Sequence, residues 1–93
     1  HLTRTPKVSA LGTSDSWYPP FTLNVGKAQG VVSGMSFYLT GVKDIQVRIV
    51  VDEVRENTSV AYVASAGRSG DYEQEIKPTV GWRFTSKLPR GYF

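Results

Sequence analysis

Cysteine is absent from this 93-residue chain, and the single histidine is the first residue, His1. Without cysteine, no disulfide can stabilise the fold and no thiolate can bind a metal. Without an interior histidine, neither a Ser-His-Asp nor a Cys-His catalytic arrangement can be assembled within the chain, and a histidine-based zinc site is excluded. We therefore expect no enzyme, no metal site and no cofactor, and a function that lies in a surface.

Long apolar runs are also missing. No run of eighteen apolar residues occurs, so we expect no membrane span, and no charged-then-apolar signal segment is present. Six of the eight acidic residues form two groups, neither of which matches a calcium-binding loop, and we expect both groups to be solvated: Asp52, Glu53 and Glu56, and Asp71, Glu73 and Glu75. A small-molecule ligand is not expected either.

What the chain does contain is a clear strand pattern. Ile45, Val47, Ile49 and Val51 fall on every second position, which is typical of a strand with one buried face. We predict a strand over 45–54 that pairs as a hairpin with a second strand over 58–65, across a short polar turn.

The rest of the chain completes a β-rich domain over residues 17–93, preceded by an extended arm over 1–16 that shows no periodicity. We predict further strands over 21–25 and 31–40, a final strand or an extended tail over 80–85, and a turn over 26–30. One short helix is predicted near residues 71–77, with Asp71 as its N-cap and Pro78 as its stop. The fold class is therefore all-β: a small antiparallel sandwich or a partial jelly roll with one short helix.

Two groups of side chains are candidates for contacts. Aromatic residues are enriched at interfaces, and seven of the eleven in this chain are candidates for contact with a partner or a ligand: Trp17, Tyr18, Phe21, Trp82, Phe84, Tyr92 and Phe93. Past Glu75 the chain carries no acid but four cations, which we predict to form a basic patch: Lys77, Arg83, Lys87 and Arg90.

The small size of the chain favours partners. A domain of this length buries only about 60 to 65% of its unfolded surface, and no cysteine is available to stabilise it. Oligomerisation is the remaining route to more buried area, so we expect a homo- or hetero-oligomer.

The order of features over the last sixty residues suggests a family. A strand ends in a small-residue turn at 37–42, an alternating strand follows at 45–54, and an Ala/Val-rich segment spans 59–66. Asp71-Tyr72-Glu73 then opens a short helix, and Leu88-Pro89 stands near the end. This order resembles the C-terminal part of single jelly-roll capsid proteins of small non-enveloped RNA viruses of the nodavirus-like kind.

The resemblance implies a fragment located in a virion. A complete jelly roll has eight strands and needs more residues than this chain has, so the missing strands would come from another polypeptide. The Arg-rich amino-terminal arm that such proteins use on RNA is missing, and no catalytic residue can be carried over.

Our main hypothesis is therefore a non-enzymatic structural protein, a capsid component if the resemblance holds, that acts through subunit–subunit contacts of its β-sheet. One alternative is a carbohydrate-binding module that stacks sugars on Trp17, Tyr18 and Trp82. The other is a weak nucleic-acid-binding domain that contacts RNA through the basic stretch at 77–90, although the net charge of +3 is modest for that role.

Overall fold

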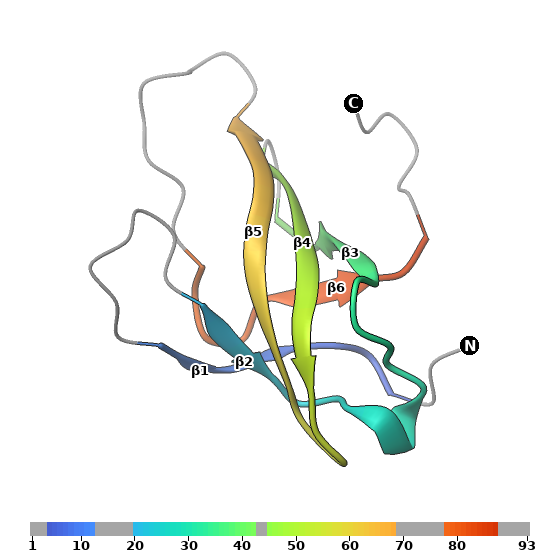
Figure 1. Ribbon diagram of the computed structural model, residues 1–93. Coiled ribbons are helices and arrows are strands. Elements are labelled where there is room, and N and C mark those ends of the chain that lie inside the picture. The colour runs from blue at the N-terminus through green and yellow to red at the C-terminus, as the bar shows by residue number, and fades with distance from the viewer. Residues whose placement is uncertain (1–3, 13–19, 43–44, 69–77, 88–93) are drawn as a thin grey trace.

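The computed structural model describes residues 4–12, 20–42, 45–68 and 78–87. These residues form six strands and one short 3-10 turn (Figure 1). In chain order the elements are β1 (Val8–Leu11), β2 (Phe21–Leu23), η1 (Lys27–Gln29), β3 (Ser36–Thr40), β4 (Ile45–Val54), β5 (Ser59–Arg68) and β6 (Arg83–Thr85). All strand pairs are antiparallel, in the order β1-β2-β5-β4-β3-β6 within one sheet. The prediction of a small antiparallel all-β fold is confirmed.

The β4–β5 hairpin contains the two longest strands of the sheet. The observed β4 has the bounds that its alternating pattern predicts, and β5 pairs with it as expected but extends to Arg68. The pairing skips one residue in each strand, Ala64 in β5 and Asp52 in β4. Such bulges bend a strand and increase its twist, which helps this long hairpin to follow a strongly curled sheet.

The sheet closes on itself through its two outer strands. Lys7 and Arg83 form an isolated antiparallel bridge. Beside it, the amide of Val8 donates to the carbonyl of Trp82 at 2.9 Å, and the amide of Phe84 donates to the carbonyl of Pro6 at 2.9 Å. The chain therefore covers its own sheet edges at β1 and β6, and the closure described here uses no strand from another polypeptide.

β1 corrects the expectation of an extended arm over 1–16. Val8 is fully buried, whereas the other three residues of β1 are exposed. A strand with one inward side chain shows no periodicity in the sequence, because at least two buried positions are needed to define a period. This strand is recognised only from its pairing with β2 and from the closure next to β6.

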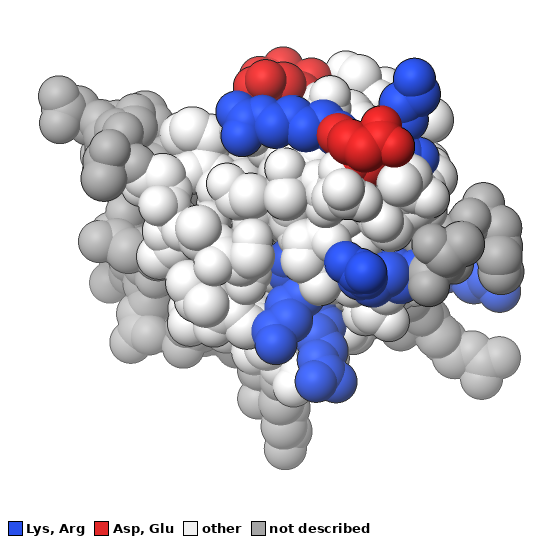
Figure 2. All heavy atoms as spheres, turned by 90° about the horizontal axis from the view of Figure 1, so that it is seen from below, with Lys and Arg blue, Asp and Glu red and all other residues white. Residues whose placement is uncertain are grey.

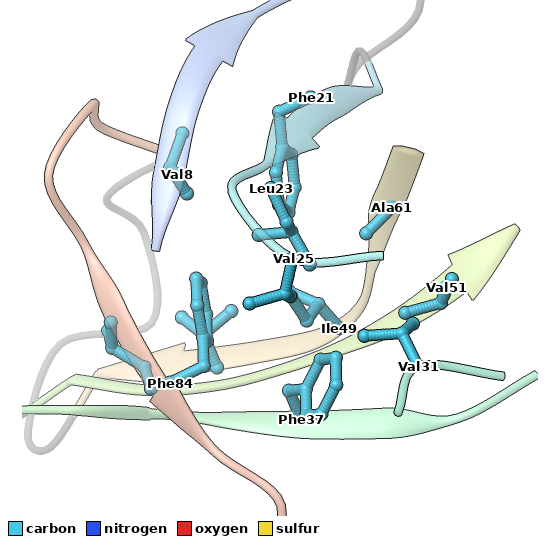
Figure 3. Packing of buried hydrophobic residues seen from close by; sticks show 12 residues of the cluster. Val8, Phe21, Leu23, Val25, Val31, Phe37, Ile49, Val51, Ala61 and Phe84 are labelled. Carbon is cyan, nitrogen blue, oxygen red and sulfur yellow. The ribbon is translucent and has the colours of Figure 1, made fainter. Parts of the chain in front are cut away.

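The core lies inside the curled sheet and receives side chains from every strand (Figure 3). Twelve apolar residues form it: Val8, Phe21, Leu23, Val25, Val31, Phe37, Leu39, Val47, Ile49, Val51, Ala61 and Phe84. The rings of Phe21 and Phe84 stack with centroids 6.4 Å apart, which joins β2 to β6 across the interior. The alternating positions of β3 and β4 point inward, as the two-residue period requires.

Several predicted elements differ in extent. The strand expected over 31–40 begins only at Ser36, because Gly34 has a φ of +88° and turns the chain before it. The final strand, expected over 80–85, is confined to β6 at Arg83–Thr85, and β2 ends at Leu23 where a strand over 21–25 was expected. The helix predicted near 71–77 lies outside the described residues.

The turn predicted over 26–30 contains η1, which packs against the tip of the β4–β5 hairpin. The amides of Lys27 and Ala28 each donate to a tip carbonyl, those of Arg55 and Glu56, at 2.8 Å. Gly26 approaches the tip so closely that an added Cβ would lie 2.2 Å from the carbonyl oxygen of Arg55. Glycine is therefore required here by close backbone approach.

Candidate interaction surface

The aromatic candidates divide into core and surface. Phe21 and Phe84 are each 1% exposed and lie in the core, which corrects the prediction that they contact a partner or a ligand. Phe84 lies in a strand only three residues long, where the sequence offers too few alternating positions to separate an inward ring from an outward one. The alternation of the apolar Phe21, Leu23 and Val25 with polar residues could have identified Phe21 as inward, since all three are buried.

Trp82 is half-buried, and its ring meets that of Phe84 edge-on, with centroids 6.5 Å apart. It is the only member of the expected Trp17, Tyr18 and Trp82 stacking platform that the structure describes. Tyr92 and Phe93, like Trp17 and Tyr18, lie outside the described residues.

The structure places the basic candidates next to residues that the sequence does not predict as their neighbours. Arg83 and Lys87 are exposed, whereas Lys77 and Arg90 lie outside the described residues. The bridge places Arg83 directly opposite Lys7, 76 positions earlier in the chain. Sequence reasoning missed Lys7 because this partnership exists only through the closure of the sheet.

We call the group of Lys7, Arg48, Arg83, Lys87 and Tyr38 the basic face. Tyr38 pairs with Arg48 of β4 on one side and with Thr85 of β6 on the other. Directly opposite residues in antiparallel strands place their side chains on the same face. Tyr38 and Arg48 each stand between two buried neighbours, so both point outward.

The remaining members of the basic face lie on β6 or beside it. Arg83 lies two positions before Thr85 on the outward side of β6, and the exposed Lys87 stands in the bend that follows this strand. The amide of Lys87 donates to Oγ1 of Thr85 at 3.2 Å, and Oγ1 of Thr40 donates to the carbonyl of Arg83 at 3.3 Å. Alternation on β3 and β4 could have identified Tyr38 and Arg48 as outward residues.

The acidic side chains that the structure describes are confined to one part of the molecule. They all lie near the tip of the β4–β5 hairpin, at Asp52, Glu53 and Glu56. Figure 2 shows these acidic side chains in one region with Lys and Arg side chains directly beside them, and further Lys and Arg side chains in another region across an uncharged area. Within the described ranges a salt bridge joins Arg55 Nε to Glu53 Oε1 at 3.4 Å, and both side chains are 58% exposed. Such an exposed pair adds little stability.

A second outward surface carries no charge, and we call it the uncharged strip. It crosses five strands in two rows, one of Ala10, Thr22 and Val60, the other of Ser36, Val50 and Tyr62. Tyr62 is 42% exposed, and Val50 and Val60 are half-buried without joining the core cluster. Arg48 and Glu53 border the strip. It combines an exposed tyrosine with aliphatic and hydroxyl side chains.

No reactive constellation emerges from the part of the chain that the structure describes. In those residues, no three or more His, Cys, Asp or Glu side chains gather where a metal ion could bind. None of the helical segments in the same ranges has the length and apolar character needed to cross a membrane. One polar atom stands out, because the Oγ of Ser59 is fully buried and has no hydrogen-bond partner.

Comparison with known proteins identified no relative of this chain. No family model, no curated protein and no solved structure matches the chain. The argument for function therefore depends on the surfaces described above.

Proposed function

We propose that this protein is a non-enzymatic assembly module whose uncharged strip contacts a second copy of the chain. The observation that carries the proposal is the strip itself, two rows of outward side chains with Tyr62 exposed and no charge within them. Depletion of charged residues together with enrichment of tyrosine distinguishes the centre of an interface from the rest of a protein surface.

The charge distribution also indicates that the partner bound at the uncharged strip is a second copy of the chain. A two-fold interface places the same surface patch of both subunits against itself. The basic face would repel its own copy in such an arrangement, because like charges would meet. The uncharged strip carries no such penalty, so it is the surface on which two copies can meet. The capsid resemblance over residues 34–93 fits this proposal, since capsid proteins act through contacts between subunits.

The test is the oligomeric state of the chain and of two lysine variants. Tyr62→Lys places a charge at an exposed position of the strip, and Val80→Lys is the matched control because Val80 is 55% exposed in a turn outside the strip. We expect sedimentation over a dilution series to show a dimer or larger species for the unmodified chain and for Val80→Lys. Tyr62→Lys should sediment as a folded monomer, because a dimer would have to bury its charge.

Two results would contradict the proposal. One is an unmodified chain that stays monomeric throughout the series. The other is a Val80→Lys chain that dissociates as readily as Tyr62→Lys, which would indicate a general effect of added charge.

A further inference from the structure

We infer that the basic face binds single-stranded nucleic acid, a role that goes beyond the proposed assembly function and uses a surface that adjoins the uncharged strip at Arg48 and Ser36. The first observation is an unfavourable pair. Lys7 and Arg83 lie directly opposite each other on adjacent strand segments, and both side chains are exposed. Like charges in that relation destabilise a sheet.

The closure of the sheet holds this pair together. The backbone bonds of Val8 to Trp82 and of Phe84 to Pro6 flank the bridge on its two sides. In the described residues no carboxylate forms a salt bridge with either cation, since the carboxylates lie near the hairpin tip. An anion bound between the two cations would relieve their repulsion.

The second observation is the arrangement around Tyr38. Arg48 lies directly across from it and Arg83 lies on its diagonal through Thr85, while the exposed Lys87 stands in the bend after β6. In an antiparallel sheet the first two relations correspond to Cβ separations of about 5 Å for the direct pair and roughly 7 Å for the diagonal one. The aromatic ring thus lies between cations of the two neighbouring strands, with a further cation in the adjoining bend.

Hydroxyl groups complete the chemistry of this face. Ser36 and Thr40 flank Tyr38 on the outward side of β3, Thr85 follows Arg83 on β6, and the guanidinium Nη1 of Arg48 donates to Oγ of Ser36 at 3.5 Å. Arg, Lys, Ser, Thr and Tyr are the side chains that contact phosphate and sugar oxygens in nucleic-acid complexes. The face therefore offers a matching set of donors.

The combination of positive charge and an aromatic ring indicates which class of ligand the basic face binds. The chain has a pI of about 9.4 and clusters cations on one face, which is the electrostatic signature of nucleic-acid binding. A tyrosine among the cations can stack on an unpaired base, which adds affinity without sequence preference. An acidic protein segment would contact the cations but would not use the aromatic ring, so the structure favours single-stranded nucleic acid as the ligand.

The binding test uses fluorescently labelled oligo-dT and oligo-rU and follows fluorescence anisotropy over a range of salt concentrations. Each phosphate contact with a single strand changes the slope of log K against log salt by about −0.7, so four cations predict a slope of about −3. The double variant Lys7→Gln/Arg83→Gln should lose about half of that slope and bind at least tenfold more weakly at low salt. Tyr38→Leu should weaken binding by about tenfold with an unchanged slope, because it removes stacking and leaves the charges.

The matched control is Lys27→Gln. Lys27 is an exposed cation on η1 beside the acidic hairpin tip, away from the basic face. We expect its oligonucleotide affinity to equal that of the unmodified chain. The double variant should unfold at the same temperature as the unmodified chain or a higher one, because removing a like-charge pair does not weaken the sheet. Loss of binding then cannot be attributed to loss of fold.

Three outcomes would overturn the inference. The first is no binding of either oligonucleotide at low salt, and the second is an equal loss of affinity in Lys27→Gln and in the double variant. The third is binding of a poly-glutamate peptide as tight as that of the oligonucleotides, which would identify an acidic protein segment as the ligand. Sedimentation of the double variant separates this inference from the assembly proposal, because its oligomeric state should not change.

Discussion

Phe84 is the residue through which the closure of the sheet can be tested most directly. It lies in β6, which is only three residues long, yet its ring stacks on Phe21 and meets the edge of Trp82. Its amide also donates to Pro6, on the strand segment that closes the sheet. If the sheet closes as described, Phe84 connects β6 and β1 to the core, and its truncation should weaken the whole domain.

The expected loss can be worked out from the burial. Phe84 is 1% exposed, and truncation of a buried phenylalanine to alanine costs about 3–5 kcal/mol. A domain of this length has a total stability of about 5–14 kcal/mol. Phe84→Ala should therefore remove a large fraction of the free energy of unfolding. Phe84→Leu keeps most of the buried volume and should cost less than half as much.

Urea denaturation followed by far-UV circular dichroism measures this loss. With an m-value of about 1.5 kcal/mol per molar urea, the midpoint of Phe84→Ala should fall by roughly 2–3 M. Val80→Ala is the control for an apolar residue of the same region, because Val80 is 55% exposed and its truncation should change the midpoint little.

A small effect would refute the reasoning. If Phe84→Ala lost less than about 1 kcal/mol with an unchanged m-value, the ring could not occupy a packed interior site, because well-packed cores do not tolerate such a cavity. The closure between β1 and β6 would then not hold the core together.

Two further predictions concern buried positions. Ser59→Ala should raise the melting temperature by several degrees, because the buried hydroxyl of Ser59 has no partner and its burial costs about 1–3 kcal/mol. The control Ser65→Ala, in the same strand, should not raise it. A lower melting temperature for Ser59→Ala would show that the Ser59 hydroxyl is hydrogen-bonded. Gly26→Ala should destabilise the domain more than Gly34→Ala does in thermal unfolding, because a Cβ at Gly26 meets backbone atoms of Arg55 and Thr58 within 2.6 Å while Gly34 faces open space and adds only the strain of its positive φ. The reverse order would mean that η1 does not pack against the hairpin tip.

The fold was predictable where a strand is long enough to show its period. The alternation from Ile45 to Val51 predicted β4 with its observed bounds, and the polar turn after it predicted the pairing with β5. Ten residues with one buried face leave a clear two-residue period. The same alternation identifies Arg48 and Tyr38 as outward side chains, so this part of the basic face could also be predicted.

The short strands behaved differently. Phe84 is of a residue type common at contacts, and its burial follows only from where β6 sits in the sheet. A strand of three residues has one or two inward positions, and its sequence cannot say which face is covered. The prediction of a contact role failed at Phe84 for this reason, whereas the alternation of Phe21, Leu23 and Val25 did indicate an inward position for Phe21.

By itself, the sequence determined that this protein is β-rich, has no thiol or interior imidazole chemistry, and builds its longest hairpin around 45–68, because composition and side-chain alternation are local properties of a chain. Only the tertiary structure decided that the sheet closes through β1 and β6 and that Lys7 faces Arg83. Those partnerships join residues 76 positions apart. They depend on how tightly a twisted sheet curls, which is set by bulges and packing that no short window of sequence contains.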